Sequence, residues 1–307
     1  MAYDGAHTGR WPVRVSVPAM NISERAVSYF SEGDRLAGVV YQDADLTGPR
    51  PGIVLCHGFT AIKEIILRDY ARAFAEAGFA ALAFDYRGFG ESEGPPGRLI
   101  ASRQVEDIRN SVTFLRTLPE VDAERVGLWG TSYGAANVIV AASEDDRVRC
   151  VTAQVGFSDG ARGLPAARPI IEAERVKRVL KNEVTLVEPL TVLSDPETVA
   201  FFSEARKSHP RLSQPISTEF FEAHSRHRPI KAVAELTNCP LLLVAAENDT
   251  LTPAGDSEAL YAAAPEPRRL VIIPGIRHYE IYSGEPLRQS AAEAVAWFSE
   301  HLGLATK

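Results

Sequence analysis

The hydrophobic residues of this chain fall into short, nearly continuous runs that alternate with longer amphipathic stretches. Runs such as Phe79–Phe84, Val126–Trp129 and Leu241–Ala246 contain almost no polar residue, which is typical of strands buried on both faces of a parallel sheet. Between such runs, stretches such as Ala101–Leu118 place apolar residues at helical spacing. Strands that alternate with helices predict an α/β fold, with a mainly parallel sheet flanked by helices on both sides.

The same criteria predict the other elements of the chain. Residues 1–12 are expected to be a loose arm, and the turn Ser31–Asp34 should join two strands in a hairpin. We expect the remaining strands at Val13–Val17, Arg25–Phe30, Arg35–Tyr41, Gly52–Leu55, Arg149–Val155, Cys239–Ala246 and Arg269–Ile273. Further helices are expected at Ile65–Ala77, after Gly134 to about Ser143, and at Pro253–Ala264 and Glu285–Leu302.

The pattern changes from residue 156 to about residue 235, where charged residues and prolines replace the strand-like runs. This stretch is too long for a plain loop. We predict a core of residues 1–155 and 236–307, with a mostly helical lid or cap insertion over the active edge of the sheet. The pairs Phe201-Phe202 and Phe220-Phe221 could line the cleft or only pack inside the insertion. Its expected helical stretches are Pro169–Leu180, Asp195–Ala205 and Thr218–Arg226.

Composition narrows the class of protein. The chain has 307 residues, 45% of them hydrophobic, and a net charge of −7, which is ordinary for a globular protein and argues against nucleic-acid binding. The start of the chain lacks the features of a signal peptide, and the apolar runs are too short to cross a bilayer. The three cysteines are odd in number, widely spaced and at strand edges, which indicates reduced thiols and a cytoplasmic location. They form no C-x-x-C motif. The expected partner is a small-molecule substrate, with no membrane, and a homodimer is a possible assembly.

The stretch Arg125–Gly134, RVGLWGTSYG, has the layout of a nucleophile elbow. The apolar strand Val126–Trp129 leads into G-x-S-x-G, and small residues with helix potential follow. A serine that projects from such a sharp turn needs small neighbours, because side chains at Gly130 and Gly134 would collide with the adjacent helix and strand. Ser132 is therefore a candidate nucleophile, although a glycine-rich turn without chemistry remains the alternative.

A serine hydroxyl becomes a nucleophile only when a base takes its proton, and an acid must hold that base in the right tautomer. The strand Leu241–Ala246 ends in a polar loop with Asp249, and the strand Arg269–Ile273 ends in a loop with His278. The order Ser132, Asp249, His278 is the one expected for this kind of fold. Taken alone, Asp249 could be only a helix N-cap or a turn aspartate before the helix that begins near Pro253, and His278 could be a surface residue.

The loop His57-Gly58-Phe59 follows an early strand and fits an oxyanion-binding role. The negative oxygen of a tetrahedral intermediate needs fixed N–H donors. We expect these donors to be the backbone N–H groups of Phe59 and Tyr133, which makes His57 a structural brace for the loop.

Several competing signals are weaker. Glu247 is a rival acid, Asp85 ends an earlier strand and is expected to organise a loop, and Cys56 is a weak rival nucleophile because no helix follows it closely. Gly88-Phe89-Gly90 lacks the third glycine of a dinucleotide-binding motif. His224 and His227 have a spacing that could hold a metal ion, but no further ligand is recognisable nearby, so we expect a solvated polar lid face. No cofactor or metal is expected.

The segments with these residues resemble the α/β-hydrolase superfamily: CHGF, FDYRGFGES, GTSYG, END and RHYE. They are similar to bacterial serine hydrolases related to dienelactone hydrolases and to prolyl-peptidase-type esterases. The resemblance covers about Arg25–Val155 and Leu236–Leu302. It implies an eight-stranded sheet, with Ser132 as nucleophile, His278 as base and Asp249 as its partner. Dienelactone hydrolases themselves use cysteine at the elbow and haloalkane dehalogenases use aspartate, so both of these activities are disfavoured.

The sequence thus predicts a cofactor-independent serine hydrolase of the carboxylesterase type, acting on a small or medium-sized ester through an acyl-enzyme. Amides, thioesters and activated C–C bonds use the same apparatus and remain open. The rival hypotheses are an acyltransferase, in which an alcohol replaces water, and a non-catalytic ligand receptor of the same fold.

Overall fold

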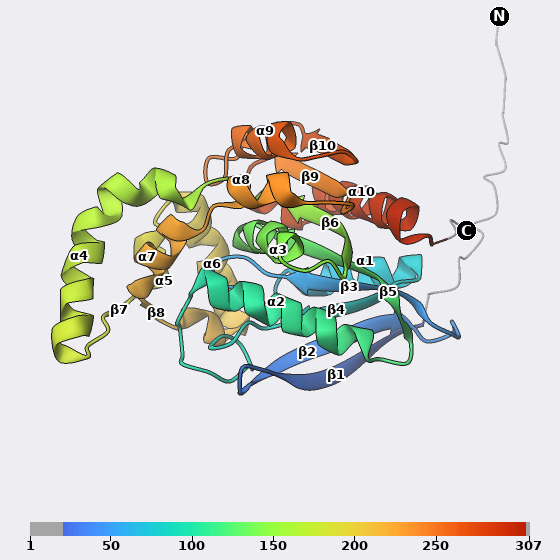
Figure 1. The fold of residues 1–307 in the computed structure, drawn as a ribbon, viewed down its shortest axis with the longest axis horizontal. Coiled ribbons are helices and arrows are strands. Elements are labelled where there is room, and N and C mark those ends of the chain that lie inside the picture. Colours follow the sequence, from blue (N-terminus) through green and yellow to red (C-terminus); the bar gives the residue numbers. More distant parts are fainter. Residues whose placement is uncertain (1–20, 305–307) are drawn as a thin grey trace, which may run out of the picture.

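The computed structural model describes residues 21–304, so the predicted arm at residues 1–12 and the strand at Val13–Val17 lie outside the described residues. An eight-stranded sheet forms the centre (Figure 1), in the order β1-β2-β4-β3-β5-β6-β9-β10. Its strands are β1 (Ile22–Ser31), β2 (Asp34–Asp43), β3 (Arg50–Cys56), β4 (Ala80–Phe84), β5 (Val121–Thr131), β6 (Val148–Gln154), β9 (Leu241–Ala246) and β10 (Arg268–Ile273). The neighbouring strands from β4 to β10 in this order pair in parallel, whereas β2 pairs antiparallel with both β1 and β4. The predicted fold class is confirmed.

The hairpin of β1 and β2 closes through two residues with left-handed backbone. Ser31 pairs with Asp34, and the φ angles of Glu32 and Gly33 between them are 48° and 94°. Two residues with positive φ form the turn whose twist matches the twist of the flanking strands. The predicted hairpin is therefore confirmed.

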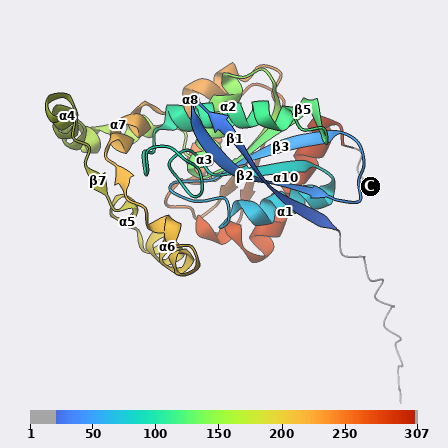
Figure 2. The ribbon, with the colours of Figure 1, turned by 90° about the horizontal axis from the view of Figure 1, so that it is seen from below.

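Helices cover both faces of the sheet, as Figure 2 shows for α2 on one side and α1 and α10 on the other. One apolar layer joins α1 and α10 to the sheet, and a second layer joins α2, α3 and α9 to its opposite face. The helices are α1 (Leu67–Ala77), α2 (Ala101–Arg116), α3 (Tyr133–Ser143), α9 (Ala254–Ala263) and α10 (Gly284–Leu302), and the short helix η4 (Tyr279–Tyr282) precedes α10. Every core element predicted within residues 21–155 and 236–304 is present.

Strand β4 shows why the central strands are apolar throughout. Leu82 and Phe84 pack into the layer with α2, whereas Ala81 and Ala83 pack into the layer with α1. Successive side chains of a strand point to opposite faces. Because both faces of β4 are covered, neither set of positions can be polar.

Residues 156–235, which we call the cap segment, are mostly helical and connect β6 to β9. Helix α4 stands clear of the sheet (Figure 1), and Glu174 is its only buried residue. The predicted helix start at Pro169 is wrong, because α4 begins at Leu164 and continues through Pro169 despite the missing N–H donor. The elements are η1 (Gly160–Gly163), α4 (Leu164–Lys181), β7 (Leu186–Val187), α5 (Pro189–Val192), α6 (Pro196–Ser208), η2 (Pro210–Ser213), β8 (Ile216–Ser217), α7 (Glu219–Arg226), α8 (Pro229–Ala232) and η3 (Val233–Glu235).

Two observations bear on the expected environment of the protein. Cys56, Cys150 and Cys239 are all buried and unpaired. Among residues 21–304, no helix combines the length and the apolar character needed to cross a bilayer. The cytoplasmic location stays a prediction.

The layer between the sheet and α1 and α10 predicts a large cost for truncating Phe74. Its ring is fully buried and lies edge-on to Phe298, with ring centroids 5.7 Å apart. Phe74→Ala should lower the free energy of unfolding by about 3–5 kcal/mol in denaturant titrations, because the cavity cannot collapse fully. The matched control is Phe30→Ala, whose ring is 70% exposed and which should cost less than about 0.5 kcal/mol. Equal costs for the two variants would contradict this packing.

Candidate active site

Ser132 occupies a strained turn between β5 and α3. Its φ and ψ angles are 55° and −120°, a region that residues with a side chain rarely adopt. The turn is held from both sides, since the Ser132 N–H donates to the Gln154 carbonyl at 2.9 Å and the Ala135 N–H donates to the Ser132 carbonyl at 3.1 Å. The surrounding backbone thus fixes the direction of the hydroxyl.

The two flanking glycines are needed for close approach. A Cβ atom on Gly130 would lie 2.3 Å from the carbonyl oxygen of Gly134 at the start of α3. A Cβ atom on Gly134 would lie 2.3 Å from the carbonyl oxygen of Cys56 at the end of β3. Neither contact is tolerable, so the predicted collisions with the neighbouring helix and strand are confirmed.

The structure brings Ser132, His278 and Asp249 together. The Nε2 atom of His278 lies 3.2 Å from Ser132 Oγ, and its Nδ1 atom lies 2.7 Å from Asp249 Oδ2. His278 and Asp249 are buried, with 1% and 5% of their surface exposed. If Nδ1–H donates to the carboxylate, then Nε2 is free to accept the serine proton. The loops after β9 and β10 supply the acid and the imidazole, because neighbouring parallel strands end at the same edge of the sheet.

Asp249 also organises its own turn, but it does not cap α9, whose N-cap is Pro253 without a side-chain hydrogen bond. Its Oδ1 atom accepts the N–H groups of Leu251 and Thr252, each at 2.8 Å. The Thr252 hydroxyl lies 2.9 Å from Asp249 Oδ2 and 2.8 Å from the Val155 carbonyl oxygen. Sequence reasoning missed Thr252, because its role depends on contacts with Asp249 and Val155 that the local sequence does not show. Thr252 ties the acid loop to the end of β6.

The predicted oxyanion loop lies directly beside Ser132. A Cβ atom on Gly58 would be 2.9 Å from the Cβ atom of Ser132. Within residues 21–304, the N–H groups of Phe59 and Tyr133 take part in none of the backbone hydrogen bonds of loops, turns and caps. His57 is buried, and its Nδ1 atom lies 2.9 Å from the Gly58 carbonyl oxygen. This geometry leaves both predicted N–H donors available near the hydroxyl.

A buried ion pair fixes this loop to the loop after β4. Lys63 Nζ lies 2.8 Å from Asp85 Oδ2, and the Lys63 N–H donates to Asp85 Oδ1 at 2.8 Å. Burial by itself would lower the pKa of the Lys63 ammonium, but the carboxylates of Asp85, Glu64 and Glu91 together outweigh burial and raise that pKa above its ordinary value. Asp85 also accepts the Glu91 N–H at 2.9 Å. Asp85 therefore organises the loop, and sequence reasoning missed its partner Lys63.

The surroundings of the rival acid Glu247 and the rival nucleophile Cys56 do not suit a catalytic role. Glu247 is exposed, and its Oε2 atom accepts the Gly275 N–H at 2.7 Å. Cys56 is fully buried at the end of β3, and burial raises the pKa of its thiol well above the ordinary value. A thiol held in its neutral form is a poor nucleophile.

Ser132 opens onto a cavity of about 570 Å³ between the core and the cap segment. The walls are largely apolar, which suits an organic substrate of small or medium size. The polar groups along the walls include His224, Asp159 and Arg162. The main apolar side chains come from both parts of the chain: Phe59, Phe157, Leu164, Ile170, Leu193, Phe220 and Phe221.

Only one of the two predicted phenylalanine pairs reaches this cavity. Phe220 and Phe221 line it. Phe201 and Phe202 instead pack around Tyr279, and the Phe201 ring stacks on the Tyr279 ring with centroids 4.4 Å apart. Spacing could not distinguish the pairs, because both lie on amphipathic helices of the cap segment.

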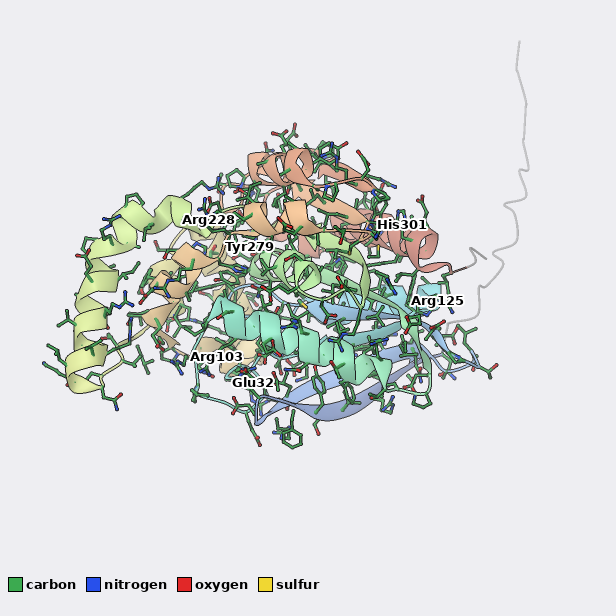
Figure 3. All side chains as sticks on the ribbon, viewed as in Figure 1. Glu32, Arg103, Arg125, Arg228, Tyr279 and His301 are labelled. Carbon is green, nitrogen blue, oxygen red and sulfur yellow. The ribbon has the colours of Figure 1, made fainter. Side chains whose placement is uncertain are left out.

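Helix α6 of the cap segment is bonded to the loop that holds His278. Glu197 Oε1 accepts the Tyr279 N–H at 3.0 Å, and the Tyr279 hydroxyl donates to Thr198 Oγ1 at 3.1 Å. Figure 3 shows Tyr279 near the cap segment, whereas Arg125, near the start of β5, lies well away from it. The cap segment thus helps to position the imidazole.

The expectation that His224 and His227 lie on a solvated face is wrong. His227 is 6% exposed, and both rings pack against Tyr133 and Phe157. Burial lowers the pKa of His224 to about 4, and burial with the nearby His224 lowers the pKa of His227 to about 3. Among the residues that the structure describes, no group of three or more potential ligands could hold a metal ion.

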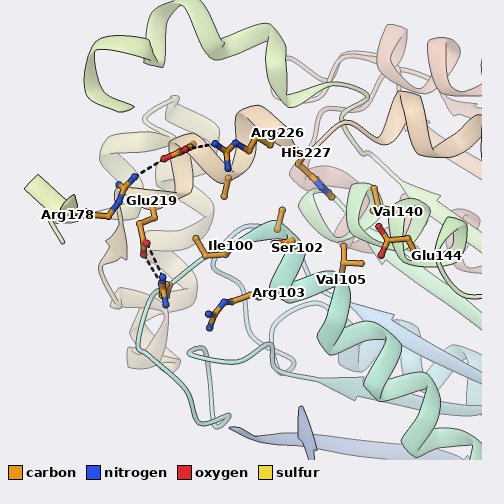
Figure 4. A pocket seen from close by; sticks show the side chains of 14 residues that line it. Ile100, Ser102, Arg103, Val105, Val140, Glu144, Arg178, Glu219, Arg226 and His227 are labelled. Carbon is orange, nitrogen blue, oxygen red and sulfur yellow. Dashed lines mark hydrogen bonds and ion pairs between the residues drawn. The ribbon is translucent and has the colours of Figure 1, made fainter. Parts of the chain in front are cut away.

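A second cavity of about 380 Å³ lies between the start of α2 and the cap segment. Figure 4 shows Ser102 and Arg103 at the start of α2, with Arg178 and His227 on the cap segment. Arg178 pairs with Glu222 at 2.7 Å. Ser132 does not line this cavity, so it is separate from the candidate site.

The comparison with protein families agrees with this geometry. Residues 47–283 match the family described as "Serine aminopeptidase, S33". The chain belongs to this family. It is accordingly a member of the α/β-hydrolase superfamily, as the sequence motifs predicted.

Curated relatives of this family member span most of its length. A 31.7 kDa protein from the traX-finO intergenic region of Escherichia coli is 36% identical over 82% of this chain and 91% of its own length. The quorum-quenching protein AidA of Acinetobacter baumannii is 26% identical over 80% and 84% of the two chains. A thiohydrolase of Eupenicillium brefeldianum is 27% identical over 81% and 85%.

Solved structures agree with the fold of the S33 family member. The structure titled DcsB in complex with its substrate analogue has a TM-score of 0.82 at 23% identity, covering 92% of this chain and all of that one. The hypothetical protein PA2218 of Pseudomonas aeruginosa has a TM-score of 0.80 at 26% identity, covering 91% and 94% of the two chains.

The ion pair of Lys63 and Asp85 predicts that neutralising Asp85 lowers the free energy of unfolding more than neutralising Glu91, which also lies beside Lys63. Asp85→Asn removes the fully buried carboxylate at this ammonium and leaves the more exposed carboxylates of Glu64 and Glu91. This change should lower the free energy of unfolding by about 3 kcal/mol. The control Glu91→Gln removes a carboxylate whose side chain is 47% exposed and that also lies 2.8 Å from Lys63 Nζ. A surface pair of this kind contributes at most about 1 kcal/mol. Denaturant titration checks both values, and a larger loss for Glu91→Gln would contradict the assignment.

Proposed function

We propose that this chain is a serine hydrolase that cleaves a carboxylic ester of a small or medium-sized substrate through an acyl-enzyme. One observation carries the proposal. Hydrogen-bond distances of 2.7 Å and 3.2 Å connect Asp249 to His278 and His278 to Ser132, at the mouth of a largely apolar cavity. This arrangement supplies an activated hydroxyl next to a space for an acyl group.

The proposed reaction has two halves. Ser132 Oγ attacks the carbonyl carbon while His278 Nε2 accepts its proton, and the same proton then goes to the leaving alcohol. Water next takes the place of the alcohol, gives a proton to His278, and releases the acid while Ser132 regains its hydrogen. Asp249 stabilises the imidazolium that forms in both halves. This chemistry requires no cofactor.

In this proposal the N–H groups of Phe59 and Tyr133 hold the negative oxygen of each tetrahedral intermediate. Fixed donors that need no rearrangement typically lower such a barrier by several kcal/mol. Tyr133 is the first residue of α3, and the positive end of the helix dipole adds to the stabilisation. The cap segment is proposed to act as the lid of the cavity, and a small molecule is the proposed partner.

Thioester cleavage is a second candidate, because relatives from Eupenicillium brefeldianum and Aspergillus aculeatus are named thiohydrolases. A relative from Penicillium crustosum is named a polyketide transferase, so acyl transfer to an alcohol is a third candidate reaction. Each reaction starts from the same acyl-enzyme. Matched oxygen esters and thioesters, assayed with and without an added alcohol, distinguish the three outcomes.

Covalent labelling tests the nucleophile. A fluorophosphonate should label the parent protein once and leave Ser132→Ala unlabelled, as intact-mass spectrometry measures. The matched control is Ser143→Ala at the far end of α3, where the hydroxyl donates to the Val140 carbonyl. This control should be labelled like the parent. A parent protein with neither adduct nor esterase activity would favour the ligand receptor instead.

A pair of isosteric variants tests the acid. Asp249→Asn should lower kcat by about 10⁴-fold, because the imidazole loses the partner that fixes its tautomer. Glu247→Gln should change kcat less than about twofold, since its carboxylate bonds a loop away from the imidazole. Steady-state kinetics on one ester measure both. The assignment is wrong if the two variants exchange these effects.

A further inference from the structure

Three buried polar atoms without partners gather around Tyr133. Within the described residues 21–304, Tyr133 Oη, His224 Nδ1 and His227 Nε2 have no hydrogen-bond partner. The ring of Tyr133 lies 5.7 Å from that of His224 and 5.9 Å from that of His227, centroid to centroid. Native proteins rarely leave buried polar atoms unpaired, because each such atom costs about 1–3 kcal/mol. Three such unpaired atoms in one cluster indicate that a bound group supplies their missing hydrogen bonds.

Two members of the cluster, Tyr133 and His224, belong to the wall of the candidate active-site cavity, whereas His227 lines the second cavity. Tyr133 and His224 both line that cavity together with Phe157 and Phe220. Phe220 stacks on the His224 ring at 5.3 Å, and Phe157 lies edge-on to it at 4.8 Å. A half-turn of the His224 ring about its Cβ–Cγ bond would exchange the ring edges that face the cavity.

The chemistry of the cluster selects a neutral partner. A phenol can donate or accept one hydrogen bond, and a neutral imidazole does both through its two nitrogens. Burial lowers the pKa of His224 to about 4 and of His227 to about 3, so both rings are uncharged at neutral pH. Uncharged donors and acceptors suit a hydroxyl or keto oxygen better than a carboxylate.

We infer that Tyr133 and His224, with the His227 ring stacked on Tyr133, form a hydrogen-bonding subsite for a neutral oxygen substituent on the acyl chain of the substrate. The favoured substrates then carry a hydroxyl or keto group several carbons from the carbonyl that Ser132 attacks. The apolar side chains of the cavity contact the carbon atoms between the carbonyl group and the oxygen substituent of the substrate. This inference rests on the proposed hydrolase function and narrows its substrate class.

A panel of matched esters tests the subsite. Ethyl octanoate is compared with ethyl hydroxyoctanoates and ethyl oxooctanoates that bear the oxygen at successive positions, and released acid is measured by chromatography. At least one position should raise kcat/KM about tenfold over the plain ester, as one good hydrogen bond allows. The position and type of the best substituent distinguish hydroxyl from keto recognition, and a monoester of a dicarboxylic acid should show no gain.

Two variants connect this preference to the cluster. Tyr133→Phe and His224→Phe should each bring the ratio of kcat/KM for the best oxygenated ester to kcat/KM for the plain ester to within about twofold of one. The ratio is the readout, because any loss at the oxyanion donors slows both esters alike. The matched control Tyr279→Phe removes a hydroxyl that bonds Thr198 outside this cavity, and it should keep the ratio of the parent.

Stability gives a second readout for Tyr133→Phe. Removing a hydroxyl without a partner should leave the Tm unchanged or raise it, whereas removing one that binds a structural water should lower it. A lower Tm together with no substituent preference would overturn the subsite in favour of that water. A preference that persists in both Phe variants would overturn it as well.

Failure of the hydrolase proposal is separable from failure of the subsite. If the parent hydrolyses no ester and forms no fluorophosphonate adduct, the chemistry is wrong. Binding of the same esters to Ser132→Ala, measured by calorimetry, still tests the cluster. About tenfold tighter binding of one oxygenated ester than of the plain ester, lost in Ser132→Ala with Tyr133→Phe, supports the subsite. Equal binding overturns it.

Discussion

The backbone of Ser132 is the constraint on which the rest of the site depends. A residue with φ of 55° is unfavourable by itself, and it persists because β5, β6 and α3 determine the position of the chain on both sides. The hydrogen bond from Ser132 N–H to the Gln154 carbonyl belongs to the sheet, and the close contact of Gly134 with Cys56 belongs to the packing of α3 on β3. The strain is therefore compensated by the core rather than by the site.

The arrangement of strands explains why residues far apart in the sequence meet. Parallel strands end at one edge of the sheet, so the loops after β3, β5, β9 and β10 lie side by side. That edge brings the loop with Phe59 next to Ser132, and the loops with Asp249 and His278 next to each other. The cap segment adds a second constraint, because Glu197 and Thr198 bond Tyr279, the residue after His278.

The sequence allowed a reliable prediction of the core but not of the cap segment. Continuous apolar runs such as β4 have one explanation, namely burial on both faces, so the strands and their fold class followed directly. Helix α4 did not, because a proline inside a helix and a proline at its start have the same local pattern. The candidate site was predictable where a backbone requirement constrains the residue type, as at Gly130 and Gly134.

Features that depend on contacts across the fold were beyond sequence reasoning. Lys63 and Thr252 are ordinary residues until Asp85 and Asp249 lie beside them. His224 and His227 had the spacing of an exposed helix face, and only the packing of Phe157 and Phe220 makes them buried and neutral.

The order of the partners along the chain has a consequence for synthesis. Ser132 and His278 are separated by 146 residues, and the cap segment and β9 lie between them. A ribosome therefore makes the strained serine turn long before it makes the imidazole. Until β10 is added to the edge of the sheet, the nascent chain has a hydroxyl in place but no base beside it. The proposed hydrolase chemistry would therefore require the loop after β10, which is made late in synthesis.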